Sequence, residues 1–251
     1  MSRTVYLDGQ YLPEAEAKVS IFDRGFVMAD GVYEVTSVLD GKLLELNGIT
    51  DGLVYLQVTR GNAGDRDFAF PPEGTPQTVV MFTQAKPGLA ENPQAQTGLR
   101  VISAPDLRWH RRDIKTVQLL YPSLLKMEAK ARGADDAWLV EDGFVTEGTS
   151  NNTYIVKDGT LITRDLSNDI LHGITRTALL RLANEAQIKV EERPFTLAEA
   201  QAADEALITS ASAFVLPVVE IDGAQVGNGQ PGPIAARLRE IYLEESRKTA
   251  I

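Results

Sequence analysis

The sequence of 251 residues contains no cysteine and only two histidines. Without thiols the chain can form no disulfide, no thiolate nucleophile and no thiolate metal site, and two histidines are too few for a histidine-rich metal centre. Hydrophobic runs are also short: none approaches the ~18 residues of a membrane span, and the N-terminus lacks the apolar core of a signal peptide. We therefore expect a cytoplasmic protein with no metal site and no membrane partner.

Basic residues are the minority among the charged ones. Lys and Arg number 25 against 35 Asp and Glu, which gives a net charge of −10. A nucleic-acid-binding domain is usually basic, so we expect no nucleic-acid partner. The hydrophobic share of 43% and the charged share of 24% are those of a globular protein. At ~150 residues per domain the length predicts one large domain or two modest ones.

Asp-Gly pairs are a strong hairpin signal, and we expect hairpin turns at those that follow here, each beside apolar or alternating residues. Their positions are 8–9, 40–41, 142–143, 158–159 and 222–223. The strand pairs that we expect are 35–39 with 42–46, 137–140 with 144–146, and 153–156 with 160–163; further strands are expected at 53–59, 79–83 and 99–103. Because these strands are not in regular alternation with helices, the pattern predicts an α+β fold.

Three helices are expected in the later part of the chain. The first covers 119–132, with apolar positions 120, 124, 127 and 131, and stops at Gly133. The second covers 175–186 with Thr175 as a possible N-cap. The third starts near Pro233, a suitable first-turn residue, and runs to about residue 245.

The segment 87–97 is polar, contains two prolines and lacks periodicity. This composition indicates a linker between a small domain over 1–86 and a larger one over 98–251. A long surface loop is the equally simple alternative.

Common catalytic motifs are missing from the chain. There is no G-x-S-x-G and no Walker A sequence. Residues 227–232 match G-x-G-x-x-G, but they lie too near the C-terminus to open a βαβ unit of ~30 residues. We expect a turn there that leads into the last helix.

Lys115 follows a run of cationic side chains and leads into apolar residues. The preceding cations are Arg108, His110, Arg111 and Arg112. Neighbouring cations and apolar surroundings both favour the neutral amine of a lysine, which a Schiff-base lysine requires. The alternative is a solvated basic stretch at the end of a strand.

Three other segments carry polar groups that suit a cofactor. Glu147 is followed by glycine, hydroxyl and amide residues at 148–152. Gly173 precedes a helix start, whose free N–H groups suit a phosphate. Small hydroxyl residues at 209–212 follow an expected strand. Together with the amine of Lys115, these segments supply a carboxylate and two stretches of backbone that can bind an anion.

Six ordered motifs extend this pattern from the first strands towards the last helix: DRG at 23–25, DGVYEV at 30–35, TRG at 59–61, DIK at 113–115, TEGTS at 146–150 and GITR at 173–176. In this order they resemble the branched-chain and D-amino-acid aminotransferases, the class IV enzymes of fold type IV that depend on pyridoxal 5′-phosphate. DGVYEV and TEGTS are most similar to the D-amino-acid transaminases. The resemblance implies an α+β protein with a small N-terminal domain, a larger C-terminal domain and the cofactor between them.

The resemblance also implies roles for single residues. Lys115 would hold the cofactor covalently and move a proton between substrate Cα and cofactor C4′. Glu147 would face the pyridine nitrogen and keep it protonated, and Leu171 would pack on the ring. The remaining cofactor-binding positions are Thr149, Ser150, Gly173, Ile174, Thr175, Ser210 and Ala211, of which the last four would hold the phosphate.

Three residues would form the substrate side of the site. Tyr33 would line the substrate pocket, and Arg66 would bind the substrate carboxylate from across the interface of a homodimer. D-amino-acid transaminases often have Arg-x-His in this loop, whereas here Phe68 stands at the histidine position. Asp65 and Asp67 would partly neutralise Arg66. The expected carboxylate site is therefore looser, which favours side activity on (R)-primary amines.

A second departure lies between Leu46 and Asn47. Relatives carry a helical stretch there, including an arginine that binds the phosphate, and this chain continues directly. Either the protein lacks a helical lobe of its small domain, or the sequence omits a segment, and the intact motifs on both sides favour the second.

The resulting hypothesis is an aminotransferase that moves the amino group of a D-amino acid to a 2-keto acid, of the D-alanine:2-oxoglutarate type. The alternatives within the fold are a branched-chain aminotransferase, an (R)-amine transaminase and a lyase similar to aminodeoxychorismate lyase. A cofactor-binding remnant without activity is the non-enzymatic alternative.

Overall fold

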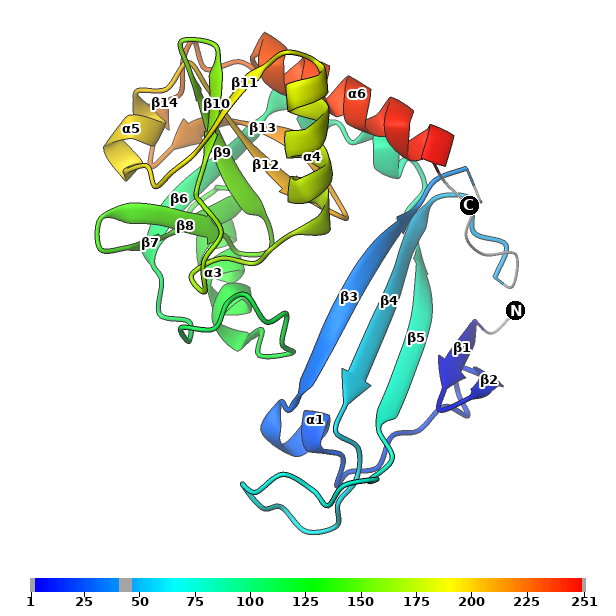
Figure 1. Cartoon of the computed structure of the whole chain (residues 1–251). Helices are drawn as coiled ribbons and strands as arrows, with labels where there is room; N and C mark the ends of the chain where they lie inside the picture. The colour runs from blue at the N-terminus through cyan, green and yellow to red at the C-terminus, as the bar shows by residue number, and fades with distance from the viewer. Residues whose placement is uncertain (1–2, 41–46, 250–251) are drawn as a thin grey trace. The chain divides into compact units, whose positions relative to one another are not determined.

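The computed structural model describes residues 3–40 and 47–249, and these form two compact units. The first unit runs to Leu89 and also includes Ile114–Leu119, whereas the second contains Ala90–Asp113 and Leu120–Thr249 (Figure 1). The division differs from the expected one in two respects. Residues 90–97 belong to the second unit, and the short segment with Lys115 joins the first although both of its flanks lie in the second.

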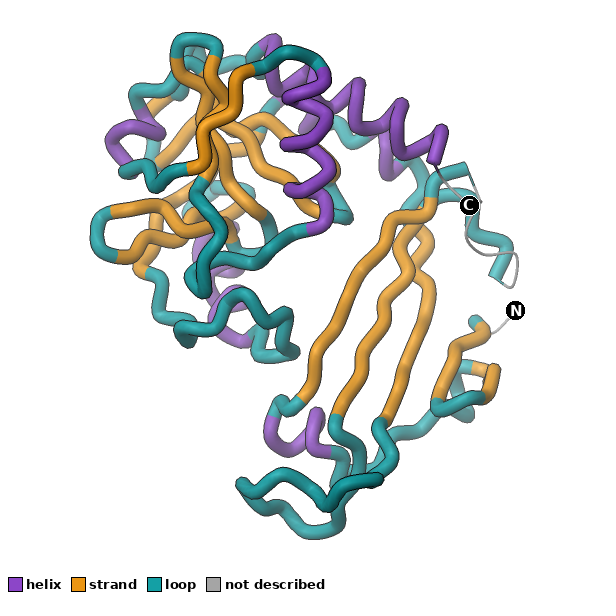
Figure 2. The backbone as a smooth tube through the Cα atoms, viewed as in Figure 1, coloured by secondary structure: helices purple, strands orange, loops and turns teal. Residues whose placement is uncertain are grey.

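The first unit is an antiparallel sheet of five strands. Its strands are β1 (Thr4–Leu7), β2 (Gln10–Pro13), β3 (Gly31–Val38), β4 (Gly52–Thr59) and β5 (Thr78–Ala85), in the order β2-β1-β5-β4-β3. One short helix, α1 (Arg24–Met28), precedes β3. Figure 2 shows β3, β4 and β5 as three long neighbouring strands.

The second unit is built on a larger mixed sheet. Its main path is β11-β10-β9-β12-β13-β6-β7-β8, with β14 paired to β13. The strands are β6 (Leu99–Pro105), β7 (Asp136–Glu141), β8 (Phe144–Gly148), β9 (Asn152–Lys157), β10 (Thr160–Thr163), β11 (Lys189–Glu192), β12 (Glu205–Ser210), β13 (Phe214–Ile221) and β14 (Ala224–Gln225). The helical elements are η1 (Leu89–Glu91), which begins at the unit boundary, α2 (Gln94–Thr97), α3 (Leu120–Ala131), α4 (Ile174–Glu185), α5 (Leu197–Gln201) and α6 (Pro233–Thr249). Strands and helices do not alternate regularly, so the predicted α+β class is confirmed.

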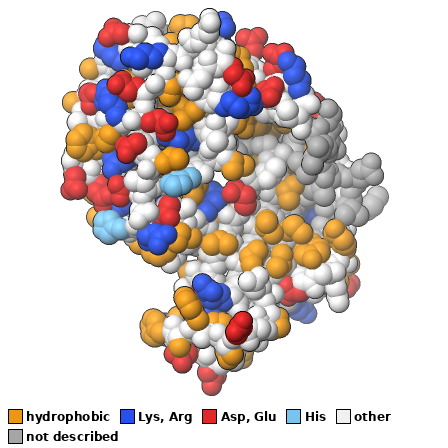
Figure 3. Space-filling view, viewed as in Figure 1, with side chains coloured by type: hydrophobic (Ala, Val, Ile, Leu, Met, Phe, Trp, Pro, Cys, Tyr) orange, Lys and Arg blue, Asp and Glu red, His pale blue; other side chains and the backbone are white. Residues whose placement is uncertain are grey.

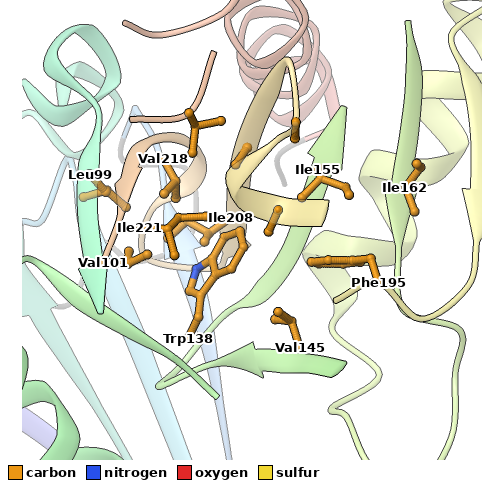
Figure 4. Packing of buried hydrophobic residues seen from close by; sticks show 14 of the residues in the cluster. Leu99, Val101, Trp138, Val145, Ile155, Ile162, Phe195, Ile208, Val218 and Ile221 are labelled. Carbon is orange, nitrogen blue, oxygen red and sulfur yellow. The ribbon is translucent and has the colours of Figure 1, made fainter. Parts of the chain in front are cut away.

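Apolar side chains fill both faces of the large sheet. On one face Trp138 and Phe195 meet edge to face, with ring centroids 6.3 Å apart, among aliphatic residues such as Ile155 and Ile221 (Figure 4). On the other, α4 and α6 pack against β9, β12 and β13, while α3 covers β6 and β7. No helix within 3–40 and 47–249 is long and apolar enough to cross a membrane.

The Asp-Gly turns form as expected where the structure describes them. Asp8, Asp142, Asp158 and Asp222 all have positive φ, between 47° and 52°, and the glycine after each is also left-handed. Two consecutive residues with positive φ fit the right-handed twist of a hairpin. The turn at 40–41 and the strand expected at 42–46 lie partly or wholly outside the described residues.

The structure corrects the expected faces and ends of the helices. Leu120, Leu124 and Met127 do not face the core: their exposed fractions are 76%, 58% and 62%, and α3 packs through Pro122, Leu125 and Ala129 instead. Periodicity indicates that a helix has an apolar face, but α3 has two such faces. The sheet covers only the face with Pro122, Leu125 and Ala129. The N-cap of α4 is Gly173, since Thr175 already lies inside the helix. The final helix extends beyond residue 245 to Thr249.

β3 and β4 are antiparallel neighbours, paired from Gly31 with Thr59 to Val38 with Gly52. In the sequence the stretch between Val38 and Gly52 is too short to contain a further helical lobe of a few tens of residues. At its end Asn47 exchanges two hydrogen bonds with the backbone of Thr4 and donates to Thr83.

A buried carboxylate stabilises the start of α6. The turn at 227–232 leads directly into this helix, as expected, and Glu205 on β12 accepts the N–H groups of Ile234 (3.0 Å) and Ala235 (2.8 Å). These N–H groups lack partners within the helix, and a negative charge is favourable at a helix N-terminus.

We expect Glu205→Ala to destabilise the protein by about 2 kcal/mol, because two buried N–H groups lose their acceptor. Thermal unfolding should show a midpoint roughly 4–8 °C lower. Glu240→Ala, which removes an exposed glutamate from the same helix, is the matched control and should change the midpoint little. Equal midpoints in the two variants would contradict the capping role of Glu205.

Candidate active site

Lys115 lies on a short extended segment that pairs with the outer edge of β3. Lys115 accepts the N–H of Tyr33 at its carbonyl (3.0 Å), Thr116 forms an antiparallel bridge with Val32, and Val117 donates to Gly31 O (3.1 Å). These bonds explain why the segment belongs to the first unit. The side chain of Lys115 is half-buried, and its Nζ lies 4.6 Å from the centre of the Tyr33 ring.

Tyr33 continues a row of stacked aromatic rings across the small sheet. Its ring stacks on Tyr55 with centroids 5.6 Å apart, and Tyr55 stacks on Phe82 at 4.8 Å. Tyr55 and Phe82 are directly opposed on β4 and β5. Burial raises the pKa of Tyr55 above its ordinary value. The structure therefore brings the predicted lysine and the predicted pocket tyrosine together on one aromatic surface.

Arg66 and Phe68 lie on the exposed loop between β4 and β5. The Arg66 guanidinium is 4.9 Å from the centre of the Phe68 ring, and Phe68 is 78% exposed. Among the described residues 3–40 and 47–249, neither Asp65 nor Asp67 forms an ion pair with Arg66, and Asp67 accepts the N–H of Ala69. The expected partial neutralisation of Arg66 by its two flanking carboxylates stays a prediction.

Arg24 anchors this loop through its backbone. The side chain is buried, and Nη1 donates to Asp67 O (2.7 Å) and Ala69 O (3.1 Å), while Nε pairs with Asp30 (2.7 Å). Asp30 also pairs with Arg60, whose guanidinium lies 4.0 Å from the centre of the Phe70 ring. The DRG and TRG motifs therefore have a structural purpose, which is to fix the loop that presents Arg66 and Phe68.

Glu147, in the second unit, is a buried carboxylate on β8 with three hydrogen-bond donors. Oε1 accepts from Arg108 Nη1 (2.5 Å), and Oε2 accepts from the Leu171 N–H (2.9 Å) and from Asn152 Nδ2 (3.3 Å). Burial raises the pKa of Glu147 above its usual range, and the charge of Arg108 and the N–H of Leu171 oppose this rise. Because all three partners donate, the geometry is that of an ionised carboxylate in an ion pair.

Behind Glu147 the charges alternate in sign. Arg108 makes a two-pronged contact with Asp106 through Nε (2.9 Å) and Nη2 (2.6 Å). Asp106 lies 3.4 Å from Arg112, which makes a second two-pronged contact with Glu141. Although burial disfavours its charge, hydrogen bonds from Arg108 and Thr146 hold the pKa of Asp106 below its usual range. Arg108 and Arg112 are thus paired with carboxylates of their own unit, which the basic run before Lys115 did not suggest.

Asn152 connects Glu147 to the N-terminus of α4. Asn152 Nδ2 donates to Leu171 O (2.9 Å) as well as to Glu147, and a Cβ on Gly173 would come within 2.3 Å of Asn152 Oδ1. Gly173 caps the helix without a side-chain hydrogen bond. The first N–H groups of α4 can therefore bind an anion, and only glycine fits against Asn152.

The other predicted cofactor residues have varied surroundings. Ile174 is 57% exposed and Thr175 is buried. Ser210 accepts the N–H of Ala213 in the turn that also contains Ala211, and Thr209 pairs with Asn152 in the sheet. Thr149 is committed elsewhere, since its hydroxyl donates to the buried Asp136 (2.5 Å), and Ser150 is exposed.

Sequence reasoning missed several residues that hold these groups within the two units. Asn152 was visible in the polar stretch after Glu147, but nothing indicated that it joins Glu147 to the start of α4. Asp106 carried no signal beyond its charge, and Arg24 was visible only as part of the DRG motif, with no indication of the carbonyl groups that it binds. Arg108 was noticed as a cation, and its partner could have been suggested only by knowing that β6 and β8 flank β7.

Comparisons with known proteins agree over almost the whole chain. The family model described as amino-transferase class IV matches residues 32–221. The D-alanine aminotransferase of Bacillus licheniformis is 36% identical over 285 residues, covering 98% of this chain and 99% of the relative. That of Staphylococcus haemolyticus is 35% identical over 282 residues, with the same coverage. Because 285 exceeds the 251 residues of the chain, at least 34 positions of the first alignment have no residue here.

Solved structures show the same fold. The branched-chain amino acid aminotransferase of Escherichia coli superposes with a TM-score of 0.85 at 20% identity, covering 97% of this chain and 94% of that one. The branched-chain enzyme of Thermobaculum terrenum, solved in its PLP-bound holo form, gives 0.83 at 22% identity with the same coverage. At these identities the likeness concerns the fold alone.

We expect Arg24→Met to loosen the loop that carries Arg66. Two loop carbonyls lose a charged donor, and hydrogen bonds of this kind contribute ~1.5–3 kcal/mol each. Amide hydrogen exchange over 62–70 should become at least about tenfold faster. Arg66→Met is the matched control, because it removes an arginine from the same loop without removing a backbone hydrogen bond. Similar exchange in the two variants would show that Arg24 does not anchor the loop.

Proposed function

The chain belongs to the class IV aminotransferases, enzymes that use pyridoxal 5′-phosphate, and we propose that it transfers the amino group of a D-amino acid to a 2-keto acid. The observation that carries the proposal is the match to D-alanine aminotransferases at 35–36% identity over nearly the full length of both chains. D-alanine and 2-oxoglutarate are accordingly the first substrate pair to test. We also propose that the enzyme works in the cytoplasm, where small amino acids and keto acids are metabolised.

The residues present fit the cofactor. A buried, ionised carboxylate suits a protonated pyridine nitrogen, and Glu147 provides one. An N-terminus of α4 without a side-chain cap suits a phosphate, for which Ile174 and Thr175 would supply N–H groups, with Ser210 and Ala211 in the neighbouring turn; the N–H of Gly173 already donates to Leu171 O. Leu171, whose N–H is bound to Glu147, would pack on the ring. Lys115 supplies the amine for covalent attachment.

When bound, the pyridine ring of the cofactor withdraws electrons from the bonds at substrate Cα. Lys115 Nζ would take the proton from Cα and return it at C4′ of the bound cofactor, and it would move the proton in the opposite direction with the incoming keto acid. Glu147 would keep the pyridine nitrogen protonated in both half-reactions. The two half-reactions make the overall reaction ping-pong.

On the substrate side, Tyr33 lines the pocket and Arg66 binds the substrate carboxylate. We propose that Arg66 does so in the neighbouring subunit of a homodimer. Exposed apolar side chains support the dimer, since monomers seldom expose large apolar patches. They gather on the first unit, as Figure 3 shows, and on the free face of α3. These residues are Val19, Ile21, Phe22, Phe26, Phe68 and Phe70 in the first unit, and Leu120, Leu124 and Met127 on α3.

A second candidate activity is transamination of (R)-primary amines. The exposed ring of Phe68 lies against Arg66 and offers an apolar surface where a substrate without a carboxylate can pack. Phe68 supplies no second donor to a carboxylate, so selectivity for α-amino acids should be weak.

We expect Lys115→Ala to abolish turnover and covalent cofactor attachment, since no other amine takes its place on the Tyr33 ring. Borohydride treatment of the wild type with pyridoxal 5′-phosphate should label the peptide that contains Lys115. Lys130→Ala, an exposed lysine on α3, is the control and should retain both activity and label. A label at Lys126 or Lys130 would overturn the assignment.

We expect Arg66→Ala to lower kcat/KM for D-alanine about tenfold, the cost of ~1.4 kcal/mol of carboxylate binding, and to leave (R)-phenylethylamine unchanged or improved. Equal losses on both substrates would mean that Arg66 supports the loop and does not contact the carboxylate.

The shared site has its own test. In mixed dimers of Lys115→Ala and Arg66→Ala chains, one site would carry both defects and the other neither, so activity should return on mixing. Light scattering should give the mass of two chains. Lack of recovery in a confirmed mixed dimer would place Arg66 in its own subunit's site.

A further inference from the structure

One acceptor position of Glu147 remains open. An ionised carboxylate offers about four lone-pair positions. Oε2 uses two of them for the Leu171 N–H and Asn152 Nδ2, whereas Oε1 uses one for Arg108. The oxygen that is left with a lone pair is therefore the one that Arg108 holds, so any further donor to Glu147 shares an oxygen with this guanidinium.

Arg108 cannot turn away from Glu147, because Asp106 fixes it. Asp106 binds Nε and Nη2 along one edge of the guanidinium, and only Nη1 is left for Glu147. Asp106 is itself held by the hydroxyl of Thr146 (2.7 Å) and by its backbone N–H, which donates to Val140 O (2.8 Å). The side chain of Asp106 has no exposed surface, and that of Arg108 is 13% exposed.

The outer part of this chain of charges keeps Asp106 ionised. Arg112, whose side chain is 1% exposed, lies next to Asp106 and is clamped by Glu141, and Glu141 in turn lies 3.7 Å from the exposed His110. From Glu141 to Glu147 the signs alternate through five side chains. Each inner charge thus has an opposite charge beside it, which a buried charge needs to persist.

We propose that Arg108, oriented by Asp106, is the positioning residue that keeps Glu147 ionised and directs its free Oε1 lone pair to the cofactor's pyridine nitrogen. The inference rests on the proposed function, because it assumes that Glu147 faces this nitrogen. Arg108 acts through Glu147 and does not itself move a proton of the substrate.

The consequence concerns the pH at which Glu147 can act. The charged groups near Glu147 are Arg108 and, behind it, Asp106, while Leu171 and Asn152 present neutral donors. The charge of Arg108 lowers the pKa of Glu147 against the effect of burial. Without Arg108, Glu147 binds a proton at a higher pH, and the protonated acid no longer stabilises a pyridinium. Cofactor affinity should then fall as the pH drops through this higher value.

The experiment measures binding of pyridoxamine 5′-phosphate, which forms no covalent bond with a lysine, by fluorescence between pH 5.5 and 9. In Arg108→Met we expect about tenfold weaker binding at pH 7. The pH below which binding weakens should also lie about one pH unit higher than in the wild type. In Arg108→Lys, which keeps the positive charge, the pH at which binding weakens should return most of the way to the wild-type value. Titrations of the ligand itself are common to all variants and cancel in the comparison.

A double variant separates positioning from structural support. If Arg108 acts through Glu147, then adding Arg108→Met to Glu147→Gln should weaken binding by less than about twofold. Neither Glu147→Gln nor the double variant should show the pH shift that we expect for Arg108→Met alone. Additive losses, or a loss in Arg108→Met that does not depend on pH, would overturn the proposal. Should Arg108→Met fail to fold, Arg108→Lys and the double variant, which has no unpaired Glu147 charge, decide the question.

Two controls complete the design. Arg111→Met removes an exposed arginine of the same loop and should bind like the wild type. Binding of inorganic phosphate should be equal in all variants, since it tests the α4 N-terminus alone. If the wild type did not bind pyridoxamine 5′-phosphate, the proposed function would fail; if Glu147→Gln weakened binding and Arg108→Met did not, only the present inference would fail.

Discussion

The cost of burying the Glu147 carboxylate governs the arrangement of the second unit around it. A buried charge persists only where hydrogen bonds and opposite charges replace the water that it has lost. Three separate stretches of chain supply these partners to Glu147 on β8: the loop after β6, the start of β9 and the segment before α4. The sheet order places β6, β7 and β8 side by side, and this brings Arg108, which follows β6, to Glu147 on β8.

Local signals made much of this fold predictable. Asp-Gly turns located the hairpins at 142–143 and 158–159, since two left-handed residues in succession define the hairpin geometry whatever surrounds them. The match to the class IV family confirmed the resemblance that the six motifs carried. The free face of α3 was not predictable, because periodicity describes a helix by itself and the covered face depends on which sheet strands lie beneath it. The contact between Arg108 and Glu147 was equally hidden, because these residues lie 39 positions apart in the sequence.

The sequence also did not indicate to which compact unit the Lys115 segment belongs. In sequence it interrupts the second unit, yet its backbone bonds are with the edge of β3, and a linear division at 87–97 cannot represent this. The pairing fixes the backbone of the lysine through β3, so its position is set by main-chain hydrogen bonds rather than by the identities of the cations before it.

Arg24 holds the backbone of the loop between β4 and β5 by contacts that do not involve the loop's own side chains. Arg24 binds the carbonyl oxygens of Asp67 and Ala69, which every amino acid possesses, so exchanges of the outward side chains at 66 and 68 leave the anchor intact. Selection, natural or in the laboratory, can therefore alter the charge and size of these two outward side chains without first rebuilding the scaffold. An enzyme of this design can evolve toward new substrates in single steps, each compatible with a folded loop.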